Sequence, residues 1–155
     1  MAGIQTATGS FIDDEQTRPL VFNFLQTFFG RYDSNRASLA EMYDEAALFS
    51  MAVSTAHYNP QLAEQHRKSP LREYFQCSRN FQIVKDRLHR AAFLQQTPES
   101  IVAFQQKMPA TRHLLNSTIV ESVQRLNPPV LFISVHGRLI ECLSRPHVLP
   151  LGARG

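Results

Sequence analysis

The sequence predicts an α+β domain in which helices pack on one face of a curved antiparallel sheet. Apolar residues recur at three- and four-residue steps near 17–32 and 97–108, which is the period of a helix. Apolar and polar residues alternate over 112–126 and 130–143, and Asn127-Pro128-Pro129 joins these segments as the turn of an antiparallel strand pair. Helices that precede such a pair are typical of the α+β class.

Start and stop signals place three helices. The first begins near Thr17, whose side chain can accept a bond from a free helix N–H group, and Pro19 suits its first turn. One face of this helix collects Val21, Phe24, Leu25, Phe28 and Tyr32. A second, short helix over 35–44 is expected, with Asp33 or Ser34 as its cap. A third begins with Thr97 and Pro98 and ends at Pro109.

Alternation also predicts a strand over 47–53, and it assigns the faces of the later pair. We expect Leu115, Ile119 and Val123 to face the helices. The opposite face then mixes apolar and hydrogen-bonding groups, namely Asn116, Thr118, Val120 and Phe132. Such a face is either solvated or covered by another protein. Gly137 interrupts the second strand and predicts a bulge that bends it.

The remaining segments carry weaker signals. We expect a loop over 54–69, a short helix over 70–80, and either strand or loop over 81–95. Residues 1–16 and 144–155 lack periodicity and are expected to be flexible tails. The folded domain is therefore expected to span 17–143.

Composition places the chain among ordinary globular proteins of one domain. Its 155 residues are 43% hydrophobic and 19% charged. No apolar run reaches the length of a membrane span, and the first residues do not have the pattern of a secretory signal. Cys77 and Cys142 form neither a disulfide framework nor a zinc spacing. We therefore expect an intracellular, reducing setting.

Positive charge is concentrated in one stretch of a chain whose net charge is +3. Residues 66–90 contain seven basic and two acidic residues, and Arg67, Lys68 and Arg72 lie near its start. A basic patch attracts polyanions such as nucleic acids through counterion release. A solvated surface of long cationic side chains is the simpler interpretation and the favoured one.

Motifs for catalysis or cofactor binding are missing from the sequence. It contains no glycine-rich nucleotide-binding signature and no nucleophile elbow, and its six histidines have no metal-ligand spacing. We therefore expect no cofactor and no metal. Asp33, Asp44 and Glu121 are candidates for a general base inside a cone-shaped cavity, where burial would raise the pKa of a carboxyl group. For Glu121, a partly covered face or a cationic partner is the favoured interpretation.

Several segments resemble one family in the correct order. The string LVFNFLQTFFGRYDSNRASLAEMYDEAALFS is similar to the start of the nuclear transport factor 2-like domain. LREYFQCSRN, KMPATRH and FISVHGRL resemble the version of this domain in the large subunit of messenger-RNA export receptors. The resemblance runs from about residue 17 to residue 143.

The resemblance implies a non-enzymatic module that shuttles between nucleus and cytoplasm. In this family the sheet pairs with a small subunit of the same fold, a pocket takes Phe-Gly repeats of nuclear pore proteins, and a basic surface contacts RNA. Thr118, Val120, Phe132 and Ser134 become candidates for the partner interface, and Arg67, Lys68 and Arg72 become candidates for RNA contact. No residues are carried over for the Phe-Gly pocket.

The resemblance also has a departure. The fold of the family continues with two more long strands after the position of Leu143, whereas this chain ends in SRPHVLPLGARG. We therefore expect a sheet that lacks its last two strands and has an unpaired edge. Two other functions of the same fold stay open: a small isomerase or dehydratase that uses a carboxylate in the cone, and a nuclear import homodimer.

Overall fold

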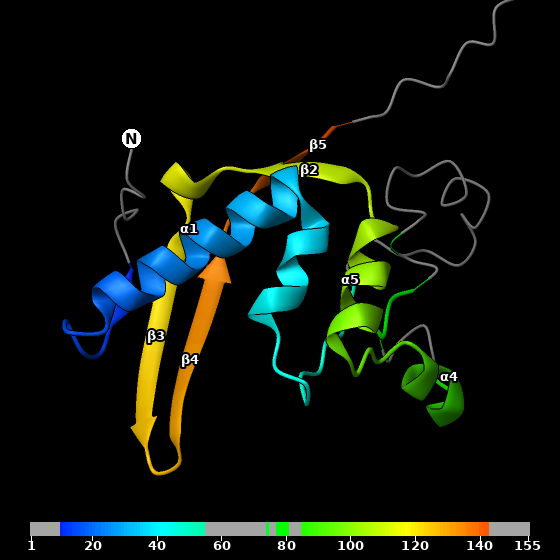
Figure 1. Cartoon of the computed structure of the whole chain (residues 1–155), viewed down its shortest axis with the longest axis horizontal. Helices are drawn as coiled ribbons and strands as arrows, with labels where there is room; N and C mark the ends of the chain where they lie inside the picture. The colour runs from blue at the N-terminus through cyan, green and yellow to red at the C-terminus, as the bar shows by residue number, and fades with distance from the viewer. Residues whose placement is uncertain (1–9, 55–73, 75–76, 81–84, 143–155) are drawn as a thin grey trace, which may run out of the picture. The chain divides into compact units, whose positions relative to one another are not determined.

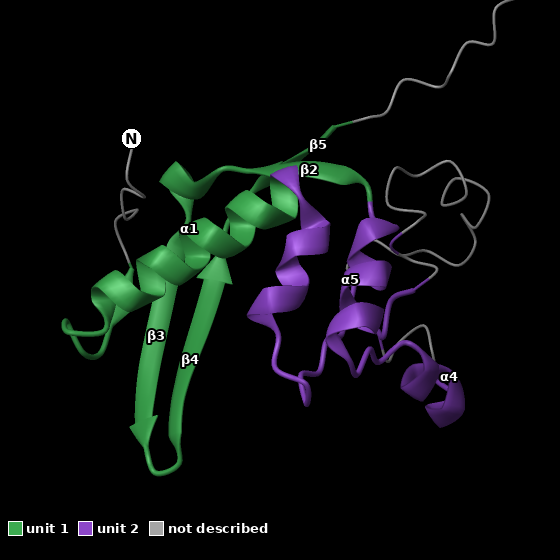
Figure 2. Ribbon diagram, in the orientation of Figure 1, with its two compact units in different colours: residues 1–33, 109–155 green, residues 34–108 purple. Residues whose placement is uncertain are grey.

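The computed structural model describes residues 10–54, 74, 77–80 and 85–142 of the chain. These residues form two compact units, one from residues 1–33 and 109–155 and the other from residues 34–108 (Figure 2). We call them unit 1 and unit 2 and describe each by itself. Among the described residues, no helix is both long enough and apolar enough to cross a membrane.

Unit 1 is built on a three-stranded sheet in the order β1–β3–β4 (Figure 1). β3 (Ile119–Leu126) and β4 (Pro129–His136) pair antiparallel over their whole lengths, from Ile119 opposite His136 to Leu126 opposite Pro129. β1 (Phe11–Ile12) adds to β3 in parallel. A second, two-stranded sheet pairs β2 (Ala110–His113) with β5 (Leu139–Cys142).

Both long strands of the predicted pair are interrupted at the same place. A turn of 3-10 helix, η3 (Leu115–Ser117), separates β2 from β3, so the single strand predicted over 112–126 is wrong. The side chains of Ser117 and Thr118 both donate to the carbonyl oxygen of Leu114 at 3.1 Å, and this local bonding competes with the ladder. On the partner strand, β4 ends just before Gly137, which confirms an interruption there.

Gly137 is required at this corner because its backbone comes very close to the side chain of Thr118. A Cβ atom at Gly137 would lie 2.9 Å from the hydroxyl oxygen of Thr118, closer than real contacts of this kind. The N–H group of Leu114 donates to the carbonyl of Arg138 across the same corner at 2.9 Å. The corner therefore joins the two sheets of unit 1 through backbone contact.

Helix α1 (Arg18–Ser34) crosses one face of the β1–β3–β4 sheet, as Figure 1 shows. The predicted first helix is confirmed, and Val21 and Leu25 are its buried residues. They form the core with Ile12 and Val120. Partly buried apolar side chains surround this cluster: Phe22, Phe29, Leu131, Ile133 and Val135.

The predicted assignment of the two sheet faces is wrong. Val120 is 1% exposed in the core, Ser122 is buried, and Thr118 is 4% exposed, whereas Val123 is 48% exposed. The even-numbered residues of β3 therefore face α1. Because side chains alternate along a strand, an assignment displaced by one residue reverses every one of them. Both rows of β3 contain a valine, so alternation alone did not identify the inward row.

The residues just before α1 are ordered, so the tail predicted over 1–16 is wrong for residues 10–16. Ile12 is buried, the N–H group of Asp13 donates to the carbonyl of Ser122, and the Asp13 carboxylate accepts from the N–H group of Gln124 at 2.8 Å. The hydroxyl of Ser10 accepts from the N–H group of Val120 at 3.1 Å. These contacts join a segment before α1 to β3.

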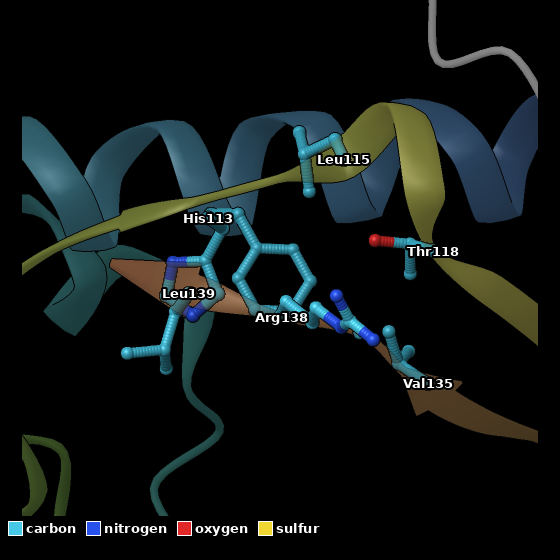
Figure 3. A pocket seen from close by; sticks show the side chains of 8 residues that line it. His113, Leu115, Thr118, Val135, Arg138 and Leu139 are labelled. Atoms are coloured by element: carbon cyan, nitrogen blue, oxygen red, sulfur yellow. The ribbon is translucent and has the colours of Figure 1, made fainter. Parts of the chain in front are cut away.

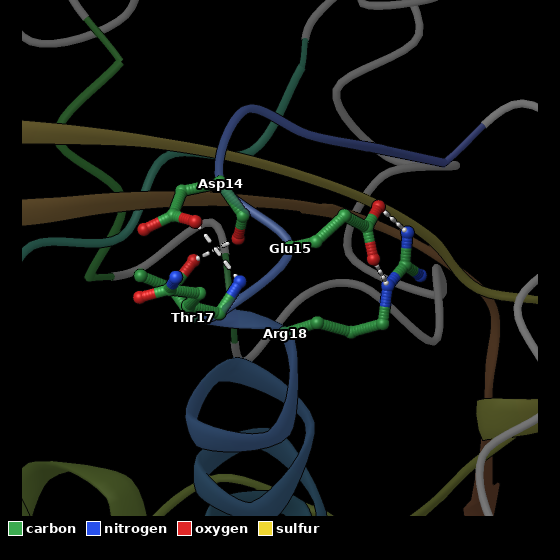
Figure 4. A network of polar contacts seen from close by, with 5 residues as sticks. Asp14, Glu15, Thr17 and Arg18 are labelled. Carbon is green, nitrogen blue, oxygen red and sulfur yellow. Dashed lines mark hydrogen bonds and ion pairs between the residues drawn. The ribbon is translucent and has the colours of Figure 1, made fainter.

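A compact turn then leads into α1 (Figure 4). The Thr17 hydroxyl donates to the carbonyl of Asp14 at 2.7 Å, and the Arg18 guanidinium donates twice to the Glu15 carboxylate at 2.6 Å. The hydrogen bond from Arg18 lowers the pKa of Glu15. The Thr17 hydroxyl therefore donates to the turn. Among the described residues, no helix N–H group donates to this hydroxyl, so the expected capping bond is not formed.

Unit 2 contains η1 (Arg36–Met42), α4 (Arg87–Ala92) and α5 (Pro98–Gln106). The predicted start of α5 is confirmed, because the Thr97 side chain accepts from the N–H group of Ser100 while the Ser100 hydroxyl accepts from the N–H group of Thr97. The Arg36 guanidinium donates to the carbonyls of Gln105 and Met108, which holds η1 against the end of α5.

Three predictions for unit 2 need correction. The second helix is a 3-10 helix whose N-cap is Asn35 rather than Asp33 or Ser34. The strand predicted over 47–53 is only an isolated bridge between Phe49 and Gln95, because the backbone groups of Val53 bond to side chains of residues 78 and 80.

Part of the ambiguous segment 81–95 is α4, capped by Asp86, whose pKa is lowered by bonds from the N–H groups of Leu88 and His89. The helix predicted over 70–80 lies largely outside the described residues, as does the predicted tail 144–155.

The corrected face assignment predicts opposite outcomes for two valines of β3. Val120→Lys forces a charge into the core and should lower the free energy of unfolding by about 3 kcal/mol or more. Val123→Lys, its matched control three residues away, should change it by less than about 0.5 kcal/mol because this side chain is exposed. Urea denaturation followed by circular dichroism measures both, and equal losses would contradict the assignment.

Candidate partner-binding face

The side of the β1–β3–β4 sheet that faces away from α1 is apolar over much of its area. Strand register places Phe11 beside Glu121 and Val123 opposite Phe132 on this side. Phe11 is 59% exposed, Phe132 55%, Val123 48% and Val130 39%. We call the side formed by Phe11, Ile119, Glu121, Val123, Arg125, Val130, Phe132, Ser134 and His136 the outer face. Two exposed phenylalanines on a rigid sheet are the kind of anchors that protein interfaces use.

Polar groups lie among these apolar residues. Glu121 is exposed and lies between Phe11 on β1 and Ser134 on β4. The Ser134 hydroxyl lies 3.1 Å from Nε2 of His136, and His136 is opposite Ile119 in the register. The outer face therefore combines aromatic contact area with one carboxylate, the guanidinium of Arg125 and a few hydrogen-bonding groups.

The structure separates the four predicted interface residues into two pairs. Phe132 and Ser134 lie on the outer face and are exposed. Thr118 and Val120 belong to the inward row and are buried within the chain, so they are unavailable to a partner. The sequence analysis assigned the two faces in reverse, and including these two residues in the partner interface was wrong. Sequence reasoning missed Phe11, Val123 and Val130. Val130 shares the row of Phe132, so the alternation of β4 contained its signal, whereas the choice between the two rows of β3 depends on α1 and Phe11 was assigned to a tail.

A cavity of about 210 Å³ lies at the corner of unit 1 (Figure 3). It is lined by Phe29 of α1 and by residues of the two interrupted strands: His113, Leu115, Thr118, Val135, Gly137, Arg138 and Leu139. Most of these side chains are apolar. His113 is the titratable group of the lining that is tied most closely to the fold.

Asp33 at the end of α1 holds His113 in place. Its carboxylate accepts from the Thr111 hydroxyl at 2.9 Å and from the backbone N–H group of His113 at 2.7 Å, and Nδ1 of His113 lies 2.7 Å from it. The imidazole is also tilted by 35° against the ring of Phe29, with ring centroids 4.4 Å apart, and lies nearly perpendicular to the ring of Tyr32. We call the Asp33, Thr111 and His113 contacts the latch. Three bonds occupy the Asp33 carboxylate and tie α1 to β2.

Asp33 and Glu121, the two candidate general bases in unit 1, do not come together, and the third candidate, Asp44, belongs to unit 2. Asp33 belongs to the latch, Asp44 accepts from the N–H group of Ala46 in its own turn, and Glu121 is exposed on the outer face. Within the described ranges, no group of three His, Cys, Asp or Glu side chains could hold a metal ion. Burial raises the pKa of the Cys77 thiol, which disfavours the reactive thiolate.

The residues predicted to contact RNA, Arg67, Lys68 and Arg72, lie outside the described residues. Farther along the same basic stretch, Lys85 just before α4 and Arg87 at its first position are exposed.

The sheet, covered on one face by α1, defines a domain with the nuclear transport factor 2-like fold. Residues 20–149 match the family described as "Nuclear RNA export factor, NTF2 domain". The chain belongs to this family, which confirms both the fold class and the resemblance found in the sequence.

Individual relatives agree with this membership. Human nuclear RNA export factor 3 is 34% identical over 119 residues, which are 76% of this chain and 21% of the relative. The messenger-RNA export factor MEX67 of Candida albicans is 30% identical over 160 residues, which are 94% of this chain and 25% of the relative. This chain therefore spans about a quarter or less of the length of these curated relatives.

Solved structures show the same fold. A chain in the crystal structure of the Candida albicans Mtr2–Mex67 M domain complex superposes with a TM-score of 0.69 at 26% identity, covering 81% of this chain and 71% of that one. A chain of the Mex67:Mtr2 complex with a bound Sac3N peptide gives a TM-score of 0.57 at 20% identity. The second match shows the fold alone.

The latch predicts a loss of stability when its acceptor is removed. Asp33→Asn replaces one acceptor oxygen by an NH₂ group that faces existing donors, so the free energy of unfolding should fall by about 2 kcal/mol. Thr111→Val, which removes a single donor, should cost about 1 kcal/mol. Chemical denaturation measures both. Unchanged or increased stability in Asp33→Asn would contradict the structural role and would favour an acid–base role.

Proposed function

We propose that this domain is a non-catalytic module of messenger-RNA export that pairs through its outer face with a small subunit of the same fold. The observation that carries the proposal is the exposed apolar surface formed by Phe11, Val123 and Phe132. The solved complex in which the Mex67 M domain is joined to Mtr2 supports it, because that domain is similar in fold and sequence. The names of the relatives support the role in RNA export.

The physical argument starts from the cost of leaving this face in water. Each buried apolar Å² contributes roughly 25 cal/mol, so covering two phenylalanines and two valines on a preformed sheet favours association. A sheet backbone loses little conformational freedom on binding, which reduces the entropic cost of the complex. The outer face therefore offers the aromatic centre of an interface without a need to refold.

Glu121 adds a requirement on the partner. A carboxylate covered by an interface loses its hydration and needs a cation or hydrogen-bond donor opposite it. The described residues that flank Glu121 on the outer face are Phe11 and Ser134 in neighbouring strands, so no cation flanks it from β1 or β4. We infer that the small subunit places a basic or donor group against Glu121, which fixes the register of the pair.

The enzymatic alternative has less support. An isomerase or dehydratase of this fold needs acid and base groups that converge in the cavity, whereas Asp33, Asp44 and Glu121 are not among the residues that line it, and Asp33 is held by three bonds. The import homodimer uses the same kind of sheet face and differs in the identity of the partner. A measurement of partner choice therefore separates these two binding functions.

Two further contacts extend the proposal. Contact of Arg67, Lys68 and Arg72 with RNA is supported by the excess of basic residues over 66–90 and by the exposed Lys85 and Arg87 farther along. Binding of Phe-Gly repeats and shuttling through the nuclear pore rest on the export role of the relatives. Both stay predictions for this chain.

A charge on the outer face should remove the partner. Val123→Lys places an ammonium group among Phe11, Val130 and Phe132, and we expect binding of Mtr2 to weaken at least about 100-fold, as for an interface centre. Leu126→Lys is the matched control: the same strand and substitution, at a position whose side chain points to the other side near the turn. Its affinity should stay within about threefold of the wild type.

Isothermal titration calorimetry with purified Mtr2 measures both variants, and light scattering gives the mass of the complex. A 1:1 heterodimer is expected. Two copies of the 17.6 kDa chain with no Mtr2 bound would favour the homodimer, and equal affinities for the two variants would remove the outer face from the interface.

A further inference from the structure

Strand β1 is attached to β3 by side chains at both of its ends. Just before the strand, the Ser10 hydroxyl accepts from the backbone N–H group of Val120 at 3.1 Å. Just after it, the Asp13 carboxylate accepts from the N–H group of Gln124 at 2.8 Å. The backbone pairing between these two bonds is only two residues long. The Ser10 hydroxyl therefore supplies a large part of what holds this short strand in place.

The residues that follow Ser10 form the charge pattern of a kinase substrate. The third, fourth and fifth residues after it are all acidic, over 13–15. Charge patterns help protein kinases to select their substrates, and acidophilic serine kinases require an acidic residue at the third position after the serine. Ser38 and Thr118 also have an acidic residue at that position, but each is followed by a single acid instead of a run, and Thr118 is 4% exposed. Ser10 is thus the hydroxyl group of the chain that fits this pattern best.

We propose that Ser10 is a phosphorylation site for an acidophilic serine kinase and that its modification releases β1 from β3. In the reaction, the Ser10 oxygen forms a bond to the γ-phosphorus of ATP, the bond from that phosphorus to the bridging oxygen breaks, and ADP leaves. The hydroxyl proton passes to the catalytic base of the kinase and then to water. The product carries a charge between about −1.5 and −2 at neutral pH.

The kinase reaches Ser10 when β1 opens locally. Ser10 is half-buried and lies outside the helices and strands of unit 1. Opening β1 breaks two residues of pairing and the two side-chain bonds, while the long β3–β4 ladder stays intact. Segments with so few bonds open far more often than the whole domain unfolds. The serine and the acidic run 13–15 are then presented together as an extended peptide.

A phosphate on Ser10 opposes the return of β1 to the sheet. The bond to Val120 uses the hydroxyl oxygen, which becomes an ester oxygen and a weaker acceptor after modification. Val120 is 1% exposed and Ile12 is 7% exposed in the same apolar cluster, so a phosphate at this place loses part of its hydration. The acidic run 13–15 offers it no compensating positive charge. Phosphorylation therefore favours the open form of β1.

Release of β1 also changes the outer face, because Phe11 is one of its two exposed phenylalanines. This consequence rests on the proposed function, in which that face binds the small subunit. Phosphorylation of Ser10 would then weaken the pairing by withdrawing one aromatic anchor, while Phe132 and Val123 stay in place on β4 and β3.

The first test is phosphorylation of the full 155-residue chain by casein kinase 2, an acidophilic kinase, with ATP. Mass spectrometry should find one phosphate, on Ser10, and Ser10→Ala should take up none. Asp13→Asn keeps an acceptor oxygen for Gln124 and removes the charge at the third position, so it should be modified at least about tenfold more slowly. An unmodified Ser10, or a wild-type rate in Asp13→Asn, would overturn the site.

Hydrogen exchange then tests the release of β1. The amides of Val120 and Gln124 should exchange at least about tenfold faster in the phosphorylated chain, because their acceptors leave with β1. The amide of Val123 points toward β4 and should not change. Ser10→Ala removes one acceptor without adding charge, so it should speed exchange at Val120 far more than at Gln124. Unchanged exchange at Gln124 after phosphorylation would overturn the release.

Calorimetry with Mtr2 on the same samples tests the consequence for binding. Phosphorylation should weaken the affinity at least about tenfold, as loss of an aromatic anchor does. Equal affinity of the modified and unmodified chains would overturn this regulation. Failure of the proposed function would appear separately, as an unmodified wild-type chain that does not bind Mtr2 although Ser10 is phosphorylated and exchange at Gln124 rises.

Discussion

The contact between α1 and the inward row of β3 and β4 is the interaction on which the rest of unit 1 depends. Val21 and Leu25 of the helix meet Val120 of the sheet, and Ile12 closes the same cluster from β1. Because side chains alternate along a strand, this one contact also decides which residues point outward. Phe132 and Val123 are exposed for the same reason that Val120 is buried. Stability and the candidate interface are thus two sides of one register.

A second constraint acts at the corner, where both strands stop and turn. Gly137 lets the backbone approach Thr118, and the latch of Asp33, Thr111 and His113 ties the end of α1 to β2 at the same level. The cavity between them is small and mostly apolar, and its histidine is committed to the fold. Chemistry in the cavity is therefore restricted by the same bonds that hold the domain together. The phenylalanines and valines of the outer face stay exposed instead.

Much of this fold could be predicted from local signals in the sequence. Helical spacing identified α1, the Thr97-Pro98 start identified α5, and alternation around Asn127-Pro128-Pro129 identified the β3–β4 pair. The errors at the candidate site came from interactions between distant residues. The choice of inward row depends on α1, β1 depends on pairing with β3 after more than a hundred residues, and Asp33 bonds to β2 instead of capping the next helix. No pattern within one segment contains that information, so Phe11 was missed and Thr118 and Val120 were misplaced.

Cysteine accessibility along β3 tests the central claim, that its odd-numbered residues form a docking face while its even-numbered residues form the core. Single cysteines at positions 119–124, in a chain with Cys77 and Cys142 replaced by serine, would be labelled with a thiol reagent before and after addition of Mtr2. The structure predicts fast labelling at 121 and 123 in the free protein, protection of both by Mtr2, and slow labelling at 120 and 122 throughout. Fast labelling at 120 and 122, or no protection at 121 and 123, would contradict the account.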